Sequence, residues 1–317
     1  MSPRPLELFD LPKLAGYRSE VLLLDSRQGL TRGNPLHAKG FLAYLNPTRR
    51  VYTGISDKRG VEIVGGIMQR DDEQFARLSY LAPKGRPANA SLGLIDHLVA
   101  QAGKWGAHLV AAEVEENHPY FQSLRRTGFT VCGRQRIWRF DGSLSADEDL
   151  PAYWEKEKVS DLPRIQRLQR DVIPPLLLQI EQAAHPSTGL VCKADELLAY
   201  LHVDYGSQAI FLRPLIHPNV DDIQLKLRSF LAHLPSRRAL PVYISLRSHQ
   251  AWIEGFLDHL GASAGPRQAV MVKHLAHLNR KKSAIPAGGD RVWANPAASI
   301  SGSSVTMKTT KDGDEAG

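Results

Sequence analysis

The chain has 317 residues, which is long enough for two domains of ordinary size. Hydrophobic residues make up 43% and charged residues 23%, as is typical of a soluble globular protein, and no apolar run approaches a membrane span. The first residues lead into no apolar signal-peptide core, so we expect a cytoplasmic protein with no membrane partner. Cys132 and Cys192 lie far apart and near no histidine or aspartate at ligand spacing, which argues against a disulfide framework and predicts no metal site.

The net charge of +7 suits an anionic partner, either a nucleotide cofactor or a nucleic acid. Lysine and arginine are spread through both halves of the chain, and the one dense cluster is at residues 280–282. A solvated surface explains this spread more simply than a nucleic-acid site does. We therefore do not expect nucleic acid as a partner.

The N-terminal region predicts a helix and a hairpin. Asp10 as N-cap, with Pro12 in the first turn, begins a helix that places apolar residues between Leu14 and Leu24 on one side. Two β-type runs, at residues 51–55 and 61–68, are separated by a short polar turn that contains Gly60. We expect these runs to form the first antiparallel strands of a sheet.

Residues 76–140 alternate between strand and helix patterns. The order is a strand at 76–82, a polar loop at 83–91, a helix at 92–102, a strand at 109–114, a helix at 119–126 and a strand at 129–140. In such an order the loop directs main-chain N–H groups and a helix N-terminus at a ligand beyond the strand end. This stretch therefore predicts an anionic cofactor site.

The motifs of this stretch resemble those of the GNAT superfamily of N-acetyltransferases. The family has Pro-x-x-(Arg/Gln)-x-x-Gly-x-(Gly/Ala) at the strand-to-helix turn, and here Pro83 and Arg86 match while Asn89 and Ser91 stand at the glycine positions. The spacing from Asn117 to the Gly-Phe pair at 128–129 also matches the family. Leu124 stands where the family often has a tyrosine that protonates the departing CoA thiolate.

The resemblance implies a set of acetyl-CoA-binding residues. Backbone amides of the loop would bind the diphosphate, and free main-chain groups of the splayed strand would bind the pantetheine arm. The residues implicated are Leu81, Ala82, Arg86, Ala88, Asn89, Ala90, Ser91 and Asn117. Two purely structural alternatives remain open. The loop is an ordinary one in which Ser91 or Asn89 is the N-cap of the helix that follows it, and Asn117 is the N-cap of the next helix.

Two catalytic residues follow from the same resemblance. Glu113 lies where the acceptor amine of the family would lie, and a carboxylate there could accept an ammonium proton. A solvated charge at a strand end is the structural alternative for Glu113. With Leu at position 124, the proton for the thiolate could come from Tyr120, His118 or Tyr80, of which we select Tyr120. Residues 134–136 and 267–268 are predicted to be solvated strand faces.

The second half of the chain repeats the first. A shift of 133 residues carries Gly128 onto Gly261 and Arg134-Gln135 onto Arg267-Gln268, and it keeps register through a strand and two helices. The repeated loop contains Asp221 and Asp222 instead of glycine, and these carboxylates would repel a diphosphate. We therefore predict that this half is degenerate.

The sequence thus predicts an α/β (α+β) fold with two GNAT-like domains, each a mixed, mostly antiparallel sheet flanked by helices. Expected boundaries are 1–142 for the acetyl-CoA-binding domain, 143–151 for a linker, 152–278 for the degenerate domain and 279–317 for a disordered tail. By resemblance, the protein is an acyltransferase of the tandem GNAT type that moves acetyl from acetyl-CoA to a small-molecule or peptide amine. The alternative is a non-catalytic acyl-CoA-binding sensor or scaffold.

Overall fold

The structure is a computed structural model. It describes residues 2–37, 48–58, 60–71, 73–85, 88–141, 151–181, 189–192, 196–234 and 240–275. The predicted tail at 279–317, nearly all of the predicted linker at 143–151 and Arg86 lie outside the described residues.

The first half folds as predicted from the hairpin onward. The hairpin of β3 (Arg49–Lys58) and β4 (Val61–Arg70) turns at Gly60, whose positive φ of 74° and bond from its N–H to Asp57 fit a glycine turn. The remaining elements are β1 (Arg4–Pro5), α1 (Leu11–Gly16), β2 (Leu22–Leu23), α2 (Ser26–Arg32), β5 (Phe75–Ala82), α4 (Leu92–Lys104), β6 (Leu109–Glu115), α5 (Pro119–Arg126) and β7 (Thr130–Phe140).

The second half repeats this order of elements. It contains β8 (Trp154–Lys156), α6 (Leu162–Val172), α7 (Pro175–Glu181), β9 (Gly189–Cys192), β10 (Ala199–Tyr205), β11 (Ile210–Ile216), α8 (Ile223–Ala232), β12 (Val242–Arg247), α9 (Glu254–His259) and β13 (Ser263–His274). Short 3-10 turns precede several of the helices. Gly128 and Gly261, which are 133 residues apart, both have positive φ, 88° and 78°, directly before the last strand of each half.

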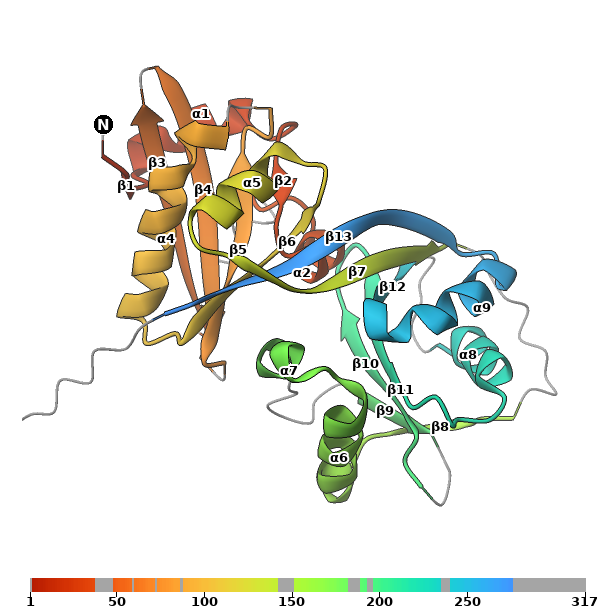
Figure 1. Ribbon diagram of the computed structural model, residues 1–317. Helices are drawn as coiled ribbons and strands as arrows, with labels where there is room; N and C mark the ends of the chain where they lie inside the picture. Colours follow the sequence, from red (N-terminus) through yellow and green to blue (C-terminus); the bar gives the residue numbers. More distant parts are fainter. Residues whose placement is uncertain are drawn as a thin grey trace, which may run out of the picture. The chain divides into compact units, whose positions relative to one another are not determined.

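All strands belong to one sheet, which is mostly antiparallel. The order is β1-β3-β4-β5-β6-β13-β7-β12-β11-β10-β9-β8, with β2 paired to β5, and only β5–β6 and β11–β12 are parallel among the described pairs. The two halves exchange their last strands: β13 lies between β6 and β7, and β7 pairs with β12 (Figure 1). The sheet of each half therefore contains the last strand of the other half.

An approximate two-fold axis passes between β7 and β13. Gln135 and Gln268, which are equivalent under the 133-residue shift, lie directly opposite each other, and the Gln135 amide donates to the Gln268 Oε1 at 2.7 Å. The pair Arg139 and Ser263 lies at one end of this register and the equivalent pair Thr130 and Val272 at the other. The repeat in the sequence is thus a symmetric arrangement in space.

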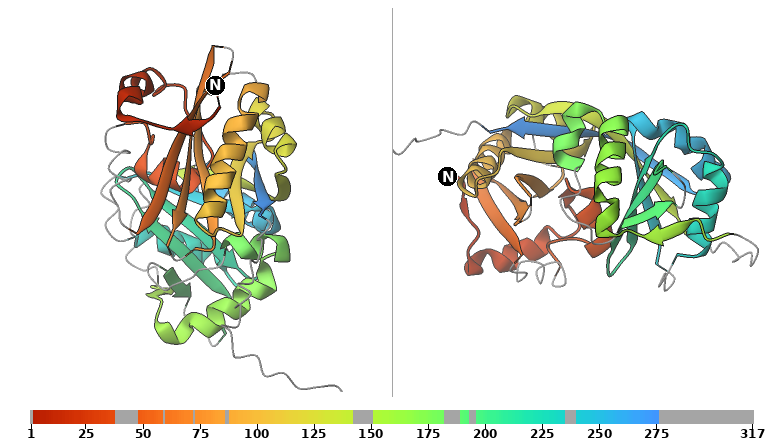
Figure 2. Two further views of the ribbon diagram at one scale, coloured as in Figure 1. Left: turned by 90° about the vertical axis from the view of Figure 1, so that its left-hand side faces the viewer. Right: turned by 90° about the horizontal axis from the view of Figure 1, so that it is seen from below.

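Four hydrophobic cores cover the faces of this sheet, and one of them is a smaller core of the first half around Leu14, Ile55 and Val64. In the first half α4 and α5 pack on the strands through Leu94, Leu98 and Leu124, and α8 and α9 do the same in the second half. The third core lies on the opposite face, where α6 and α7 contact strands of both halves. In Figure 2 these two green helices lie where the red-to-yellow and the cyan-to-blue parts of the chain meet.

One local prediction is wrong. The predicted first helix stops at Gly16, and Leu22 and Leu23 leave it to form β2, paired antiparallel with Leu81 and Tyr80. A run of three leucines fits a helix face and a buried strand equally well, and the β5 edge decides the outcome because it offers unpaired main-chain groups.

Candidate functional site

Both halves contain a pair of parallel strands that separate into a V. β5 pairs with β6 over only three residues, Phe75 to Arg77, and β11 pairs with β12 over the equivalent three, Ile210 to Leu212. In the first half Ser79 is an extra residue opposite β4, a bulge that bends β5 away from β6. Beyond these points the facing edges of the strands are not paired with each other.

The V of the first half is filled by the chain itself. Leu22 and Leu23 pair with β5, the Leu24 N–H donates to the Ser79 carbonyl at 2.9 Å, and the Leu24 carbonyl accepts from the Glu113 N–H at 2.8 Å. Leu81 is therefore paired on both sides, with Gly65 of β4 and with Leu22. The prediction that this strand offers free main-chain groups is wrong at Leu81, because Leu22 occupies its open edge, and it stays a prediction at Ala82, which among the described strands pairs with Val64 of β4.

The loop after β5 carries the other predicted cofactor residues. Ala88, Asn89 and Ala90 form a single 3-10 turn before α4, and the Arg126 guanidinium donates to the Asn89 side chain. Ser91 is fully buried at the N-cap position of α4 but has helical dihedral angles and makes no side-chain cap bond. These residues lie together beside a filled V, and their role in diphosphate binding stays a prediction.

Asn117 and Tyr120 lie around the start of α5. The N-cap is His118, whose Nδ1 accepts from the Tyr120 N–H, so the alternative of Asn117 as a cap is wrong; Asn117 is exposed in the preceding turn. Tyr120 is 0% exposed, and its hydroxyl donates to the Pro83 carbonyl at 3.0 Å. This hydroxyl is directed at the loop main chain, and the structure does not bring it together with the Glu113 carboxylate.

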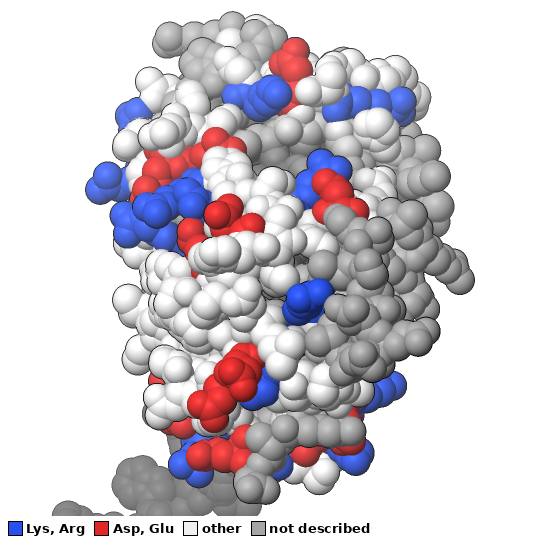
Figure 3. Space-filling view, turned by 90° about the vertical axis from the view of Figure 1, so that its right-hand side faces the viewer, with Lys and Arg blue, Asp and Glu red and all other residues white. Residues whose placement is uncertain are grey.

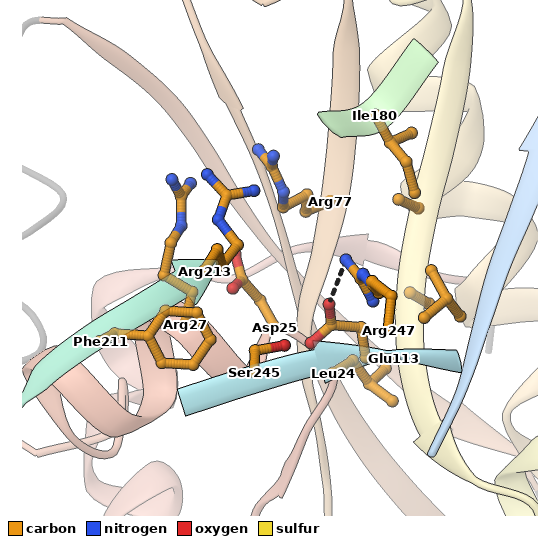
Figure 4. A pocket seen from close by; sticks show the side chains of 13 residues that line it. Leu24, Asp25, Arg27, Arg77, Glu113, Ile180, Phe211, Arg213, Ser245 and Arg247 are labelled. Carbon is orange, nitrogen blue, oxygen red and sulfur yellow. Dashed lines mark hydrogen bonds and ion pairs between the residues drawn. The ribbon is translucent and has the colours of Figure 1, made fainter. Parts of the chain in front are cut away.

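Glu113 lies inside the molecule, not in solvent. Its carboxylate accepts from the Ser26 N–H at 3.0 Å and faces the Arg247 guanidinium at 3.5 Å (Figure 4), and Arg247 also pairs with Glu181 of α7. Burial acts to raise the pKa of Glu113, but Arg247 and the Ser26 bonds outweigh it, so the pKa lies below its usual range. A carboxylate with a lowered pKa is a weak base, and this counts against the predicted role as proton acceptor.

The glutamine pair on the symmetry axis joins the same network. Gln135 is 3% exposed, and its Oε1 accepts from the Ser245 hydroxyl and from Arg247. The prediction of a solvated face at residues 134–136 is therefore wrong for Gln135, because the exchanged strands bury it between the halves. It is right for Arg134, which is half exposed and pairs with Glu116.

The V of the second half contains a cavity instead of main chain. This cavity of about 40 Å³ is lined by residues that include Arg213 and Pro214 at the point where β11 separates, Ser245 and Arg247 of β12, and His249. His249 is half-buried, its Nδ1 has no hydrogen-bond partner among the described residues, and burial, helped by Arg247, lowers its pKa although Glu181 opposes the change. His249 is thus a neutral imidazole at pH 7 that faces a cavity.

A second cavity of about 30 Å³ adjoins the first and shares Arg213, Ser245 and Arg247 with it. It lies between the halves, and Arg27 of α2 and Arg77 of β5 also line it. Sequence reasoning missed His249, Arg27 and Arg213, since they come from distant segments that only the strand exchange brings together. The one signal available was Arg213-Pro214, an abrupt interruption of an apolar strand.

No known sequence family and no curated protein matches the chain. Solved structures do match it. A GCN5-related N-acetyltransferase from Sphaerobacter thermophilus superposes with a TM-score of 0.52 at 12% identity, over 86% of this chain and 95% of its own. A tandem GNAT protein from the clavulanic acid biosynthesis pathway gives a TM-score of 0.49 at 14% identity, over 86% of this chain and 98% of its own.

At such low identity the similarity establishes the fold. The chain has the fold of the GNAT N-acetyltransferases, a mixed α/β sheet flanked by helices, as the resemblance implied. Within the described residues no helix is long and apolar enough to cross a membrane, and no group of three or more metal-ligating side chains is present. On the face drawn in Figure 3, basic and acidic side chains are interspersed.

Proposed function

We propose that the protein is an acyltransferase that moves the acetyl group of acetyl-CoA to an amine, and that the second half receives the pantetheine arm. The observation that carries this proposal is the V between β11 and β12, which contains a cavity, whereas Leu22 to Leu24 fill the V between β5 and β6. An extended thioester arm needs free main-chain groups on a strand edge, and no described strand lies between β11 and β12 beyond their pairing at Ile210 to Leu212.

His249 supports the chemistry of this step. An amine attacks the thioester carbonyl carbon only after it has lost its ammonium proton, and the new C–N bond forms as the C–S bond breaks and the thiolate leaves. The neutral imidazole of His249 is suited to take that proton, because its Nδ1 is unpartnered among the described residues and lines the cavity. Leu124 does not bear on this arrangement, since it is buried in the core of the first half.

The first test is where acetyl-CoA binds. Calorimetric titration measures binding, and hydrogen exchange with and without acetyl-CoA locates it. We expect new protection in peptides covering residues 210–216 and 242–249. Protection confined to residues 75–82 would instead mean that the cofactor displaces β2 and binds the first half, and no binding at all would end the transferase proposal.

The second test is turnover. Thiol release from acetyl-CoA is measured over a panel of amines for the wild type, for His249→Gln and for the matched control His259→Gln on the exposed side of α9. Loss of a general base costs roughly 10²-fold to 10⁴-fold in rate, so we expect kcat to fall by at least about 100-fold in His249→Gln only. Equal rates in the two variants would exclude His249 as the base.

A non-catalytic acyl-CoA-binding protein is the second candidate. The motif positions favour it, because Asn89 and Ser91 stand where the family has glycines and Leu124 stands where it often has a tyrosine. Saturable acetyl-CoA binding without thiol release over the whole amine panel would support this candidate over the transferase.

A further inference from the structure

The cavity between the halves contains more cationic than anionic groups. Its walls carry four arginines, Arg27, Arg77, Arg213 and Arg247, and two carboxylates, Asp25 and Glu113. These side chains come from α2, β5, β6, β11 and β12, so the cavity exists only in the assembled sheet. Figure 4 shows the guanidinium groups of Arg27, Arg213 and Arg77 side by side, directed the same way.

Each of the carboxylates nearby has a partner through at least one oxygen, but the buried Asp25 Oδ2 makes no hydrogen bond among the described residues. Glu73 pairs with Arg77, Glu113 and Glu181 pair with Arg247, and the Asp25 Oδ1 caps α2 by accepting from the Gln28 N–H. The Asp204 Oδ2 lies 3.6 Å from the Arg27 Nη1 and 3.3 Å from the His202 Nε2. Arg213 is the remaining cation of the cavity.

The Arg213 side chain has no hydrogen bond or ion pair among the described residues, and its Nε is buried without a hydrogen-bond partner. Burial, and then the charge of Arg27, lower its pKa, although Asp204 opposes the change. Arg70, at the end of β4, has a similar electrostatic environment. Burial and then the charge of Arg27 lower its pKa to about 10, and its Nε also has no hydrogen-bond partner among the described residues. Neighbouring cations that repel one another in a partly dry site favour an anion between them.

The geometry also places this anion site next to the proposed reaction site. Arg213, Ser245 and Arg247 line both cavities, so one face of Arg213 borders the space in front of His249. The cavity between the halves, about 30 Å³, has room for roughly two waters, which is the size of a carboxylate or a small anionic head group.

We propose that Arg213, together with Arg27 and Arg77, binds the anionic group, a carboxylate or a phosphate, of the acceptor amine, whose amino group then reaches His249. The part that concerns the amine rests on the proposed acetyl transfer. The anion site itself does not, because it is built from the cavity and its arginines.

The test uses three amines of similar size that differ in the second group: ethanolamine, β-alanine and phosphoethanolamine. Thermal unfolding of the full chain is measured at constant ionic strength without acetyl-CoA, since a ligand that binds the folded state raises Tm. We expect β-alanine or phosphoethanolamine, but not ethanolamine, to raise Tm, and the one with the larger effect identifies carboxylate or phosphate as the preferred group.

Arg213→Gln should raise the concentration of anion needed for half the effect by at least about 10-fold, and Arg125→Gln, an exposed arginine of α5, should not change it. The inference is overturned if neither anion raises Tm in the wild type, or if Arg213→Gln responds like the wild type. Circular dichroism checks that Arg213→Gln folds. If it does not fold, Arg27→Gln, on the opposite wall of the cavity, takes its place in the test and must show the same loss of anion binding.

The acetylation assay separates this inference from the proposed function. Anion binding without thiol release supports the anion site and refutes the proposed acetyl transfer. Thiol release that is as fast with ethanolamine as with both anionic amines, in the wild type and in Arg213→Gln alike, supports the transferase and refutes the role of the anion site in binding the acceptor.

Discussion

Arg247→Met tests whether Arg247 neutralises the buried carboxylates at the junction of the two halves. The Arg247 side chain is only 10% exposed, and it pairs with Glu181, with Glu113 at 3.5 Å and with the Gln135 Oε1. Methionine fills a similar volume without a charge, so Glu113 and Glu181 would be left buried without their cation.

Removal of one partner from a buried ion pair costs about 3–5 kcal/mol. At about 2.1 cal/mol/K of unfolding entropy per residue, each kcal/mol lowers the Tm of a chain of this size by roughly 1.5–2 °C, which predicts a decrease of roughly 5–10 °C. As a matched control, Arg134→Met breaks the Arg134–Glu116 pair, whose side chains are 57% and 37% exposed. An exposed pair contributes at most about 1 kcal/mol, so the control should lose much less stability.

The loss should also depend on pH. In the wild type the pKa of Glu113 is lowered below 4.5, mainly by Arg247 acting against burial, so this carboxylate stabilises the fold above about pH 4.5 and ceases to do so as the pH falls through its folded pKa. Without Arg247 the folded pKa moves upward. The difference in stability between variant and wild type is therefore largest above about pH 6 and shrinks as the pH falls towards 4.

Chemical denaturation at pH 7.5 and pH 5, on the two single variants and on the double variant Glu113→Gln with Arg247→Met, checks this reasoning. The double variant should recover about 1–3 kcal/mol of the loss at pH 7.5, because it no longer buries an unpaired Glu113 carboxylate. A loss that is the same at both pH values, or a double variant no more stable than Arg247→Met, would refute it.

Three smaller effects follow from other sites. Tyr120→Phe should cost about 1–3 kcal/mol in denaturant unfolding but leave kcat near the wild-type value, because the hydroxyl bonds the Pro83 carbonyl and its loss leaves that carbonyl unpaired; a large loss of kcat would restore a catalytic role. Gly261→Ala should cost about 1–2 kcal/mol from its φ of 78° alone, since nothing lies within 4 Å of an added Cβ. If His249 is the base, kcat/KM should fall below a pKa that is lower than 6.5, and His249→Gln should abolish that limb of the pH profile.

Local patterns predicted most elements, and they failed where a distant segment decided the outcome. The hairpin at Gly60, the helices on each core and the repeat at a shift of 133 residues follow from periodicity and turn residues alone. Leu22 to Leu24 read as a helix because nothing local shows the open edge of β5. The strand exchange is also not predictable from local sequence, because β7 and β13 align with each other and either strand could complete the sheet of either half.

The same limit applies to the candidate site. The resemblance drew attention to the loop after β5 because its motif is contiguous in sequence. His249, Arg213, Arg27 and Glu181 come from four separate segments, and only the folded sheet places them around adjoining cavities. The catalytic role of Glu113 stays a prediction, and its ion-pair partner Arg247 is 134 residues away in the chain, where no sequence pattern marks it.

The position of β13 has a consequence for synthesis of the chain. The β6 edge of the first half stays uncovered until the ribosome has delivered residues 263–274, and β7 has no neighbour until β12, at residues 242–247, has been made. A nascent chain released near residue 141 would expose two long strands at once, which invites association with other copies. The last described strand, β13, is thus the one that closes the sheet of the first-made half.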